Sequence, residues 1–348
     1  MILVCIGGIF IFAYLFFDPR VINGKKYFVL MAGGLLFLYA ALRAQDLHID
    51  IPSYIESYEK YSKYSYQEIC SLFNKENFKD PTYYFVGWLF SHIFSNPQWW
   101  LAFVAACYLI PVAIIIYKES QNPLISFFAF LALGFFEFSL SGLRQTLAMS
   151  FTILSYFGIK NRKPVLFVIM VLIASLFHQT ALLFLVVYPI ARLKLGIGHL
   201  MVFIVALVLF VGYQEPIKNF LRDYLSDTQY SYYPEQGITL NLSGFVIQAA
   251  IFIFCLIYYP TTSKKYEQSR ILYNLSFMGV VFQLFASMIA ELFRISMYFS
   301  FFNILLVTMV ITAEPSKKMR ALETIGVCLA CISYMLLTGI PRYAFFWG

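Results

Sequence analysis

Long apolar runs recur along almost the whole chain, separated by short segments that carry most of its charged residues, prolines and glycines. Twelve runs lie at 2–17, 27–42, 99–117, 124–140, 146–159, 164–177, 180–191, 198–213, 244–259, 271–290, 295–313 and 321–339. About 20 apolar residues are enough for a helix to cross a bilayer. With 61% hydrophobic and 12% charged residues, the composition argues against a soluble domain. We expect an all-α polytopic integral membrane protein of about 12 transmembrane helices, forming a single domain over 1–348.

A further run, YYFVGWLFSHIF at 83–94, decides the orientation, because counting it as a span reverses every later helix. If it is instead a short interfacial or re-entrant helix, the clusters NRK at 161–163 and KK at 264–265 lie in inner loops, where basic residues are retained. This topology predicts outer loops at 43–98 and 214–243 and both termini outside. The expected location is the cytoplasmic membrane.

Charged or titratable side chains also lie at the ends of apolar runs. They are Arg144, His178, and Glu291 with Arg294. A charge at or near bilayer depth is costly unless something there uses it. The predicted topology brings further charged residues to the same outer surface, namely Arg43, Asp46, Asp50 and Asp80. The outer face is therefore the candidate site.

The arginines indicate an anionic ligand, because a guanidinium presents fixed donors that match a phosphate in bidentate fashion. Arg144 could instead pair with Glu137, seven residues earlier. Arg294 could pair with Glu291, which lies on the same helix face at a spacing of three residues. Arg43 is the third arginine on this face. The face has fewer acidic residues available to pair with these arginines than it has arginines. The arginines favour the diphosphate of a lipid carrier as the ligand.

The sequence of the first outer loop predicts a helix that lies on the membrane surface. Asp50, directly before an Ile-Pro pair, is placed to cap a helix over 52–66. On this helix Tyr54, Tyr58 and Tyr61 share one face. The face is either an aromatic belt at the interface or a platform on which sugars stack.

His178 lies at the apex of a predicted helical hairpin formed by 164–177 and 180–191. A lone histidine at a helix end is either structural or a group that transfers a proton or binds phosphate. The sequence has no His, Asp or Glu cluster with metal-ligand spacing, and its CxxC at 328–331 lacks further ligands nearby. We expect no metal, no cofactor and no nucleic-acid partner.

Short motifs spread between residues 40 and 300 carry a family resemblance. They are Arg43, Asp46, Asp50 and Tyr54; the Asp80-Pro81 pair; GLRQTLA at 142–148; IASLFHQTAL at 173–182; and Arg294 with Tyr298. Together they resemble the EpsG-like family of bacterial polysaccharide polymerases, the Wzy class. Asp80 departs from the family, where Glu is as frequent, and the chain lacks a large outer domain.

The resemblance implies a GT-C-like, metal-independent membrane glycosyltransferase on the outer face of the cytoplasmic membrane. Such an enzyme polymerises undecaprenyl-diphosphate-linked oligosaccharide repeat units into a surface polysaccharide such as O-antigen, exopolysaccharide or capsule. The lipid-linked oligosaccharides are then both donor and acceptor, surrounded by membrane lipids. Further partners could include a chain-length regulator and a flippase.

Site roles follow from this chemistry. The expected diphosphate ligands are Arg144, Arg294 and Arg43, whose charges would stabilise the leaving group. The candidates for the catalytic base are Asp46, Glu291 and His178, with Asp46 favoured because an acceptor sugar can reach an outer loop. Glu291 would then orient Arg294, and His178 would donate to phosphate. The expected sugar ligands are Asp50, Tyr54, Asp80, Gln145 and Tyr298.

Two other classes remain open. A lipid-linked oligosaccharide flippase would also have about twelve helices, but with charges near the midplane, broken helices and an internal repeat. A membrane ligase or acyltransferase of another family would place a catalytic histidine deep in a membrane cavity, a role open to His178. The sequence indicates neither the sugar nor the linkage.

Overall fold

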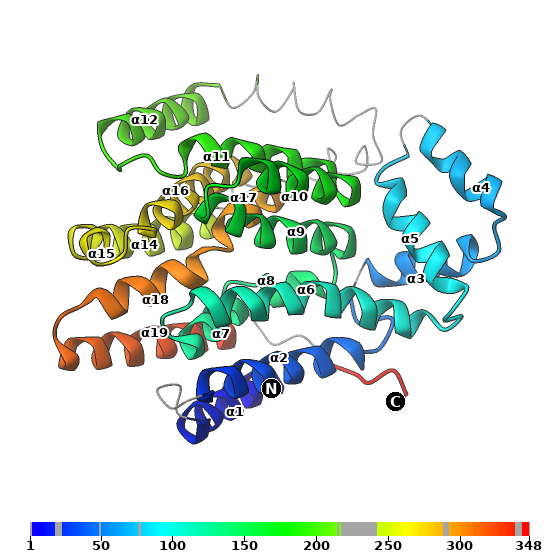
Figure 1. The fold of residues 1–348 in the computed structure, drawn as a ribbon, viewed down its shortest axis with the longest axis horizontal. Helices are drawn as coiled ribbons and strands as arrows, with labels where there is room; N and C mark the ends of the chain where they lie inside the picture. Colours follow the sequence, from blue (N-terminus) through cyan, green and yellow to red (C-terminus); the bar gives the residue numbers. More distant parts are fainter. Residues whose placement is uncertain are drawn as a thin grey trace.

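The computed structural model describes residues 2–17, 23–48, 50–75, 78–213, 216, 242–287, 292–337 and 343–347. This described part is helical, apart from turns and an isolated antiparallel bridge between Arg43 and Phe345. Most helices lie side by side in stacked layers (Figure 1), with α1 (Ile2–Phe17) and α2 (Gly24–Ala41) at one side. On the opposite side of the stack lies α12 (Ile197–Gly212).

The middle of the bundle comes from two stretches of chain. The first holds α6 (Pro97–Glu119), α7 (Pro123–Ala132), α8 (Phe135–Ser139), α9 (Leu143–Lys160), α10 (Pro164–Phe177), η2 (Gln179–Val186) and α11 (Val187–Ile190). The second holds α14 (Ser243–Ile257), α15 (Tyr259–Lys265), α16 (Ser269–Ala286), α17 (Leu292–Ser300), α18 (Asn303–Ala313) and α19 (Lys317–Leu337). One apolar core joins them, and α9 with α10 is the most extensively packed pair.

Four helices in the described residues are long and apolar enough to cross a membrane. They are Pro97–Glu119, Ser269–Ala286, Leu292–Ala313 and Lys317–Leu337. The pair α14 and α15, bent by 66°, would make a fifth. The other apolar helices, such as Pro123–Ala132 and Pro164–Phe177, are shorter. The described part of the chain is thus all-helical and of membrane type.

Apolar side chains cover the outward faces of the peripheral helices. On α12, Leu200, Val205 and Val208 are each at least half exposed, at 52%, 54% and 58%. On α19, Leu322 and Leu329 are both 58% exposed. Surfaces of this extent are unfavourable in water and suit contact with lipid tails.

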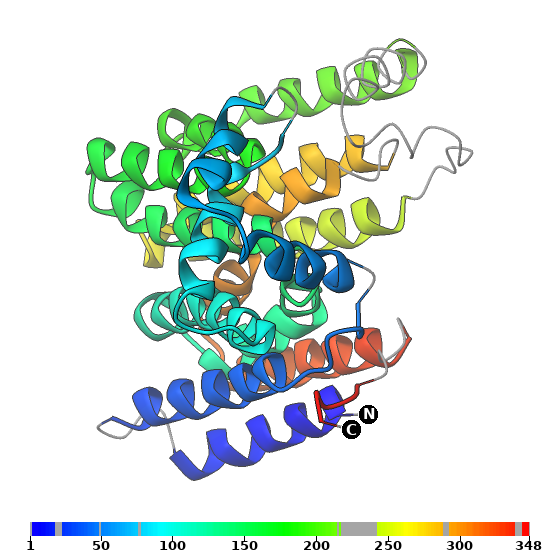
Figure 2. The same cartoon turned by 90° about the vertical axis from the view of Figure 1, so that its right-hand side faces the viewer.

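The segment 43–98 forms a separate layer across one end of the bundle. It holds α3 (Ile51–Tyr61), α4 (Tyr66–Ser71), η1 (Leu72–Asn74) and α5 (Pro81–Ser91). Figure 1 places this layer beyond the ends of α6, α9 and α10, and Figure 2 turns it toward the viewer. A small apolar core attaches it to the bundle through Ile51, Trp100 and Leu147. The other predicted outer segment, 214–243, lies almost entirely outside the described residues.

Charged contacts also mark the opposite end of the bundle. The Lys160 Nζ atom lies 2.7 Å from Glu119 Oε2, and Lys25 Nζ donates to the Ser120 carbonyl at 2.6 Å. Arg144 and Lys160 lie near opposite ends of α9, about 24 Å apart at 1.5 Å per residue. This separation approaches the roughly 30 Å of a hydrocarbon layer.

Three expectations about individual elements need correction. The predicted continuous span 124–140 is two helices, because Gly134 adopts a φ of 78° between α7 and α8. The second arm of the hairpin, 180–191, is largely a 3₁₀-helix. Asp50 precedes α3 as predicted, but its side chain makes no cap hydrogen bond and instead accepts from Ser141 Oγ at 3.2 Å.

Candidate functional site

Asp80 lies where three distant parts of the chain meet. Its Oδ2 atom is 3.2 Å from Nη1 of Arg144 and 3.2 Å from Nδ1 of His178. The three side chains are largely enclosed, with 4%, 16% and 10% of their surface exposed for Asp80, Arg144 and His178. We call these residues the Asp80 cluster. Because an ionised carboxylate only accepts, this contact fits the tautomer of His178 that carries its proton on Nδ1 and leaves a lone pair on Nε2.

The backbone of Asp80 is itself unusual. Its φ of 53° and ψ of 51° fall in the left-handed region, and Pro81 follows as the first residue of α5. Aspartate tolerates this region better than most side chains, yet the conformation still costs about 1–3 kcal/mol. Such strain persists where surrounding contacts enforce it, and the bonds to Arg144 and His178 are contacts of that kind.

The turn between α8 and α9 positions Arg144 in the first turn of its helix. Gly142 allows this turn to close, because a Cβ atom there would lie 2.5 Å from the Phe138 ring. The bond from Ser141 to Asp50 ties the same turn to the outer layer. A side chain at position 142 would therefore have to displace the Phe138 ring.

His178 ends α10, as the hairpin prediction placed it. Its N–H donates to the Ala174 carbonyl at 3.1 Å, and its φ of −160° then extends the chain before η2 begins. This extended residue turns the imidazole out of the helix and onto Asp80.

Arg144 is held on a second side by Tyr54. Its Nε donates to the Tyr54 hydroxyl at 3.4 Å, and its guanidinium carbon lies 6.0 Å from the ring centroid. The alternative pairing with Glu137 is wrong, because Glu137 Oε1 lies 3.6 Å from Nδ1 of His48 instead. Burial, followed by the charge of Arg43, lowers the pKa of His48 to about 4, so this contact is not an ion pair at neutral pH.

Two further cations face the Asp80 cluster. Gln145 Nε2 donates to the Arg294 carbonyl at 2.6 Å, which fixes the start of α17 against α9. Burial, and then the positive charge of Arg144, lower the pKa of Lys79 to about 8; Arg294 adds to this and Asp80 opposes it. Arg144 and Arg294 thus both act on Lys79, close to the Asp80 carboxylate. Sequence reasoning missed Lys79, whose only signal is its place directly before Asp80.

Tyr298 closes the site on the side of α17. It is 1% exposed, and its hydroxyl accepts a 3.5 Å hydrogen bond from Thr180 Oγ1. It also lies within electrostatic range of Asp80 and Arg294. Glu291, the expected partner of Arg294, lies outside the described residues.

A comparison of the sequence with known protein families matches the part of the chain that forms this site. A family model described as the EpsG family matches residues 26–347, which include every residue of the Asp80 cluster. The chain belongs to the EpsG family. This membership indicates a membrane protein of the polysaccharide-polymerase type. No curated protein and no solved structure matches the chain.

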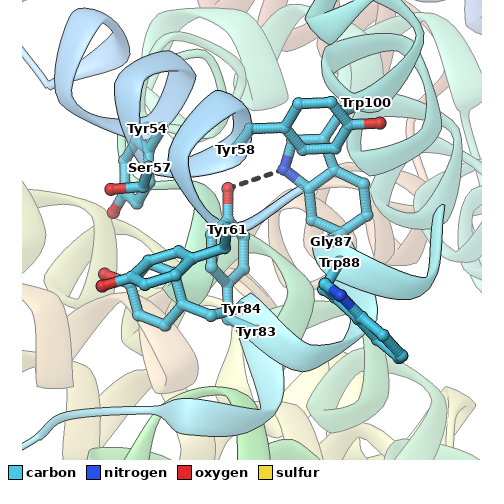
Figure 3. Close-up of a pocket in the computed structure, with 9 residues that line it drawn as sticks. All are labelled: Tyr54, Ser57, Tyr58, Tyr61, Tyr83, Tyr84, Gly87, Trp88 and Trp100. Atoms are coloured by element: carbon cyan, nitrogen blue, oxygen red, sulfur yellow. Dashed lines mark hydrogen bonds between the residues drawn. The ribbon is translucent and has the colours of Figure 1, made fainter. Parts of the chain in front are cut away.

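The aromatic layer of this EpsG family protein is tightly packed. Tyr54, Tyr58 and Tyr61 line one small cavity together with Tyr83 and Trp100, as Figure 3 shows, so their predicted shared face is confirmed. The cavity volume of about 10 Å³ leaves room for one water at most. Trp100 Nε1 donates to the Tyr83 hydroxyl at 2.9 Å. The rings pack against one another, and Tyr54 supports Arg144.

Arg43 lies apart from the Asp80 cluster of the EpsG family chain, inside the protein. It is 1% exposed and donates to the carbonyls of Ala40 at 2.6 Å and Leu140 at 3.2 Å. It thereby joins the end of α2 to the turn that precedes α9. We leave Arg43 out of the diphosphate ligands proposed below, because both terminal nitrogens already bind protein carbonyls.

Asp46 is exposed and lines a different, open groove of about 600 Å³ with Phe345 and Phe346. No residue of the Asp80 cluster lines that groove. Of the predicted site residues in this EpsG family protein, Asp80, Arg144 and His178 are in direct contact, and Tyr54, Gln145, Arg294 and Tyr298 surround them. Within the described residues, no three His, Cys, Asp or Glu side chains are grouped to hold a metal.

Proposed function

We propose that this EpsG family protein is a lipid-diphosphate-dependent glycosyltransferase that polymerises undecaprenyl-diphosphate-linked repeat units on the outer face of the cytoplasmic membrane. It would be a GT-C-like, metal-independent enzyme of about 12 spans. Donor and acceptor are both lipid-linked oligosaccharides. A chain-length regulator and a flippase are its expected partners.

The observation that supports this function best is the group of Lys79, Arg144 and Arg294 near the Asp80 carboxylate. Asp80 holds Arg144 at 3.2 Å, and both Arg144 and Arg294 act on Lys79. Cations in a largely enclosed site of a membrane protein are costly unless something there uses them. A diphosphate ester carries the charge, and the oxygen geometry, that guanidinium groups bind best.

The proposed step needs no outside source of energy, because the donor is already activated. The acceptor hydroxyl oxygen forms a bond to the anomeric carbon of the donor sugar, and the bond from that carbon to the diphosphate oxygen breaks. The lipid diphosphate leaves with the bonding electron pair. Arg144, Arg294 and Lys79 stabilise the charge that develops on it.

His178 is the base that we propose for the acceptor proton. Asp80 fixes the proton on Nδ1, which leaves Nε2 to accept the hydroxyl proton and lets the carboxylate stabilise the imidazolium that forms. Asp46 loses its place as first candidate, because it lines a separate groove. Asp80 then orients the base and holds Arg144, and it does not bind sugar directly.

The proposed orientation rests on the outer layer and on the charges at the other end of the bundle. Backbone hydrogen bonds from Ala44 N to the Ala344 carbonyl at 2.8 Å and from Phe346 N to the Leu42 carbonyl at 3.1 Å bring the C-terminal segment to the layer that holds Asp80. The Lys160 and Arg192 side chains lie at the opposite end of α9. Basic residues at that end agree with a cytoplasmic side there.

Reconstitution of the purified protein in liposomes with a synthetic undecaprenyl-diphosphate repeat unit tests the function. A polymerase yields a ladder of lengthening lipid-linked products without added nucleotide or acyl donor. A flippase moves the lipid across the bilayer without changing its length, and an acyltransferase needs an acyl donor. Transport without lengthening would reject the proposal.

A further inference from the structure

Gln145, the residue directly after Arg144 on α9, ties its helix to α17 through a buried side chain. It is 2% exposed, and its Nε2 atom donates to the Arg294 carbonyl at 2.6 Å. A carbonyl oxygen only accepts, so the nitrogen of the amide must face it. One hydrogen bond therefore joins the two helices that carry the proposed diphosphate arginines.

The other polar atom of the Gln145 amide has no partner. Its Oε1 atom is buried and makes no hydrogen bond within the described residues. A buried acceptor without a donor is costly, and an apolar side chain of similar length would avoid that cost. Packing alone therefore does not account for a glutamine at this position. What it provides, and an apolar residue could not, is the bond to Arg294.

The two arginines belong to helix pairs that pack separately. Arg144 lies on α9, which packs most extensively against α10. Arg294 lies on α17, which packs most extensively against α16. There Ser296 Oγ donates to the Gly279 carbonyl at 3.0 Å, and a Cβ atom at Gly279 would lie 3.1 Å from Ser300 Cβ. The position of Arg294 relative to Arg144 thus depends on how α17 is held against α9.

The bond from Gln145 acts close to the charged groups of both helices. Gln145 and Arg294 are each the third residue of their helix. Arg144 and Arg294 both act on Lys79, so both guanidinium groups reach the same site. The two phosphates of a diphosphate share one bridging oxygen, and their spacing is fixed. Guanidinium groups that bind both phosphates must therefore be held at a matching separation.

We propose that Gln145 is a positioning residue, which holds Arg294 at the distance from Arg144 that fits both phosphates of one diphosphate. The inference rests on the function proposed above and adds the origin of a preference for diphosphate over monophosphate. Gln145 does not touch the lipid, because its side chain is buried and its donor is occupied. Without its bond, α17 is free to settle elsewhere, and one arginine can bind a phosphate while the other no longer reaches the second.

The test compares binding of undecaprenyl diphosphate and undecaprenyl phosphate to the full-length protein in detergent. Wild type should bind the diphosphate at least about tenfold more tightly. Gln145→Met keeps the length of the side chain and loses the donor. It should reduce the preference to less than about threefold, while the affinity for the monophosphate stays within about twofold of wild type. A residue that only stabilises the fold would change both affinities alike.

Gln248→Met is the matched control. Gln248 is a glutamine of α14 that is 9% exposed, and its Oε1 accepts from Asn303 Nδ2 of α18 at 2.7 Å. This variant also removes a buried side-chain hydrogen bond, but not the bond between α9 and α17. It should therefore keep the wild-type preference for the diphosphate.

Gln145→Asn tests the same bond with a side chain that stays polar. Its amide is one methylene shorter and cannot reach the Arg294 carbonyl, so the preference should be lost here too. An unchanged preference in either folded variant would overturn the inference. Loss of folded protein in both variants would do the same, because Gln145 would then be structural.

The wild type separates this inference from the function on which it rests. Equal affinity for the two lipid phosphates, in a protein that still lengthens the synthetic repeat unit, would overturn the role of Gln145 alone. If neither lipid phosphate binds wild type, the function proposed above fails, and the inference fails with it.

Discussion

The imidazole of His178 and the carboxylate of Asp80 are hydrogen bonded at 3.2 Å, although 98 positions separate them in the chain. The same carboxylate oxygen lies 3.2 Å from Arg144. One acidic group thus orients a histidine and holds a guanidinium, and it does so at the end of α9 that faces the outer layer. The residues that we propose as base and as leaving-group cation thus share one carboxylate.

Asp80→Asn should lower the rate of chain growth at least about a hundredfold, because the amide keeps the shape but cannot stabilise an imidazolium. Donor binding should not weaken, since the substitution removes a negative charge beside the diphosphate. Rate and donor affinity are measured separately in the reconstituted system. His178→Gln should lower the rate similarly, and the double variant should be no slower than either single one, because the two residues act as a unit.

Asp46→Asn is the matched control for Asp80→Asn. Asp46 lines a groove that the Asp80 cluster does not reach, so this variant should keep its rate within about threefold, as is usual for exposed sites away from the chemistry. The opposite pattern, with Asp46→Asn inactive and Asp80→Asn active, would move the base to Asp46.

Donor affinity should fall as the pH rises through about 8, because Lys79, with its pKa lowered to about 8 by burial and by Arg144, loses its proton there. Below that pH the ammonium is charged and binds the diphosphate. A bound diphosphate itself favours the charged form, which shifts the loss in the complex to higher pH. Lys79→Arg should remove the pH dependence, because arginine stays protonated. A wild-type affinity that is flat between pH 7 and 9.5 would exclude Lys79 from the site.

The sequence predicts several residues of the Asp80 cluster because each is marked by the residues next to it in the chain. Arg144 and His178 are conspicuous as polar residues at the ends of apolar runs, and the helix break at His178 was predicted from the same pattern. Lys79 was missed because one lysine in an outer segment looks solvated, and only the fold brings it beside Arg144 and Arg294.

Other features depend on tertiary contacts that no local pattern encodes. Arg43 looked like a ligand, yet the carbonyls that bind it belong to Ala40 and Leu140, and the second is 97 positions away. The bridge between Arg43 and Phe345 joins the residues just after α2 to the C-terminal segment, and no local pattern in either segment predicts it. Gly134 ends α7 within an apolar run that contains no proline after Pro123.

Gly158→Ala should destabilise the protein, because a Cβ atom at Gly158 would lie 2.8 Å from the Phe167 backbone nitrogen and neither helix backbone can yield cheaply. Overpacking of this kind costs about 1–3 kcal/mol. The thermal unfolding midpoint in detergent is the measurement. Gly326→Ala is the control, since nothing lies within 4 Å of its Cβ position in α19, and it should be neutral or slightly stabilising. Equal midpoints for both variants would contradict the close packing of α9 on α10.

The orientation can be checked by labelling intact cells with an impermeant thiol reagent. A cysteine at Ser62, between α3 and α4, should be modified, and one at Ser263, on α15, should be protected. The wild type, with its six native cysteines, sets the background. Labelling at Ser263 with protection at Ser62 would place the Asp80 cluster on the cytoplasmic side.

Arg144→Lys and Arg294→Lys test the central claim most directly, because lysine keeps the charge and loses the bidentate geometry that a diphosphate requires. The measurement is the yield of lengthening products from the synthetic lipid-diphosphate repeat unit, with Arg162→Lys as an exposed arginine control at the other end of α9. We predict that each of the two site variants loses at least about tenfold in yield, equivalent to about 1.4 kcal/mol of transition-state stabilisation, while the control stays at the wild-type level. Near-full activity in both folded site variants would contradict a diphosphate held by Arg144 and Arg294.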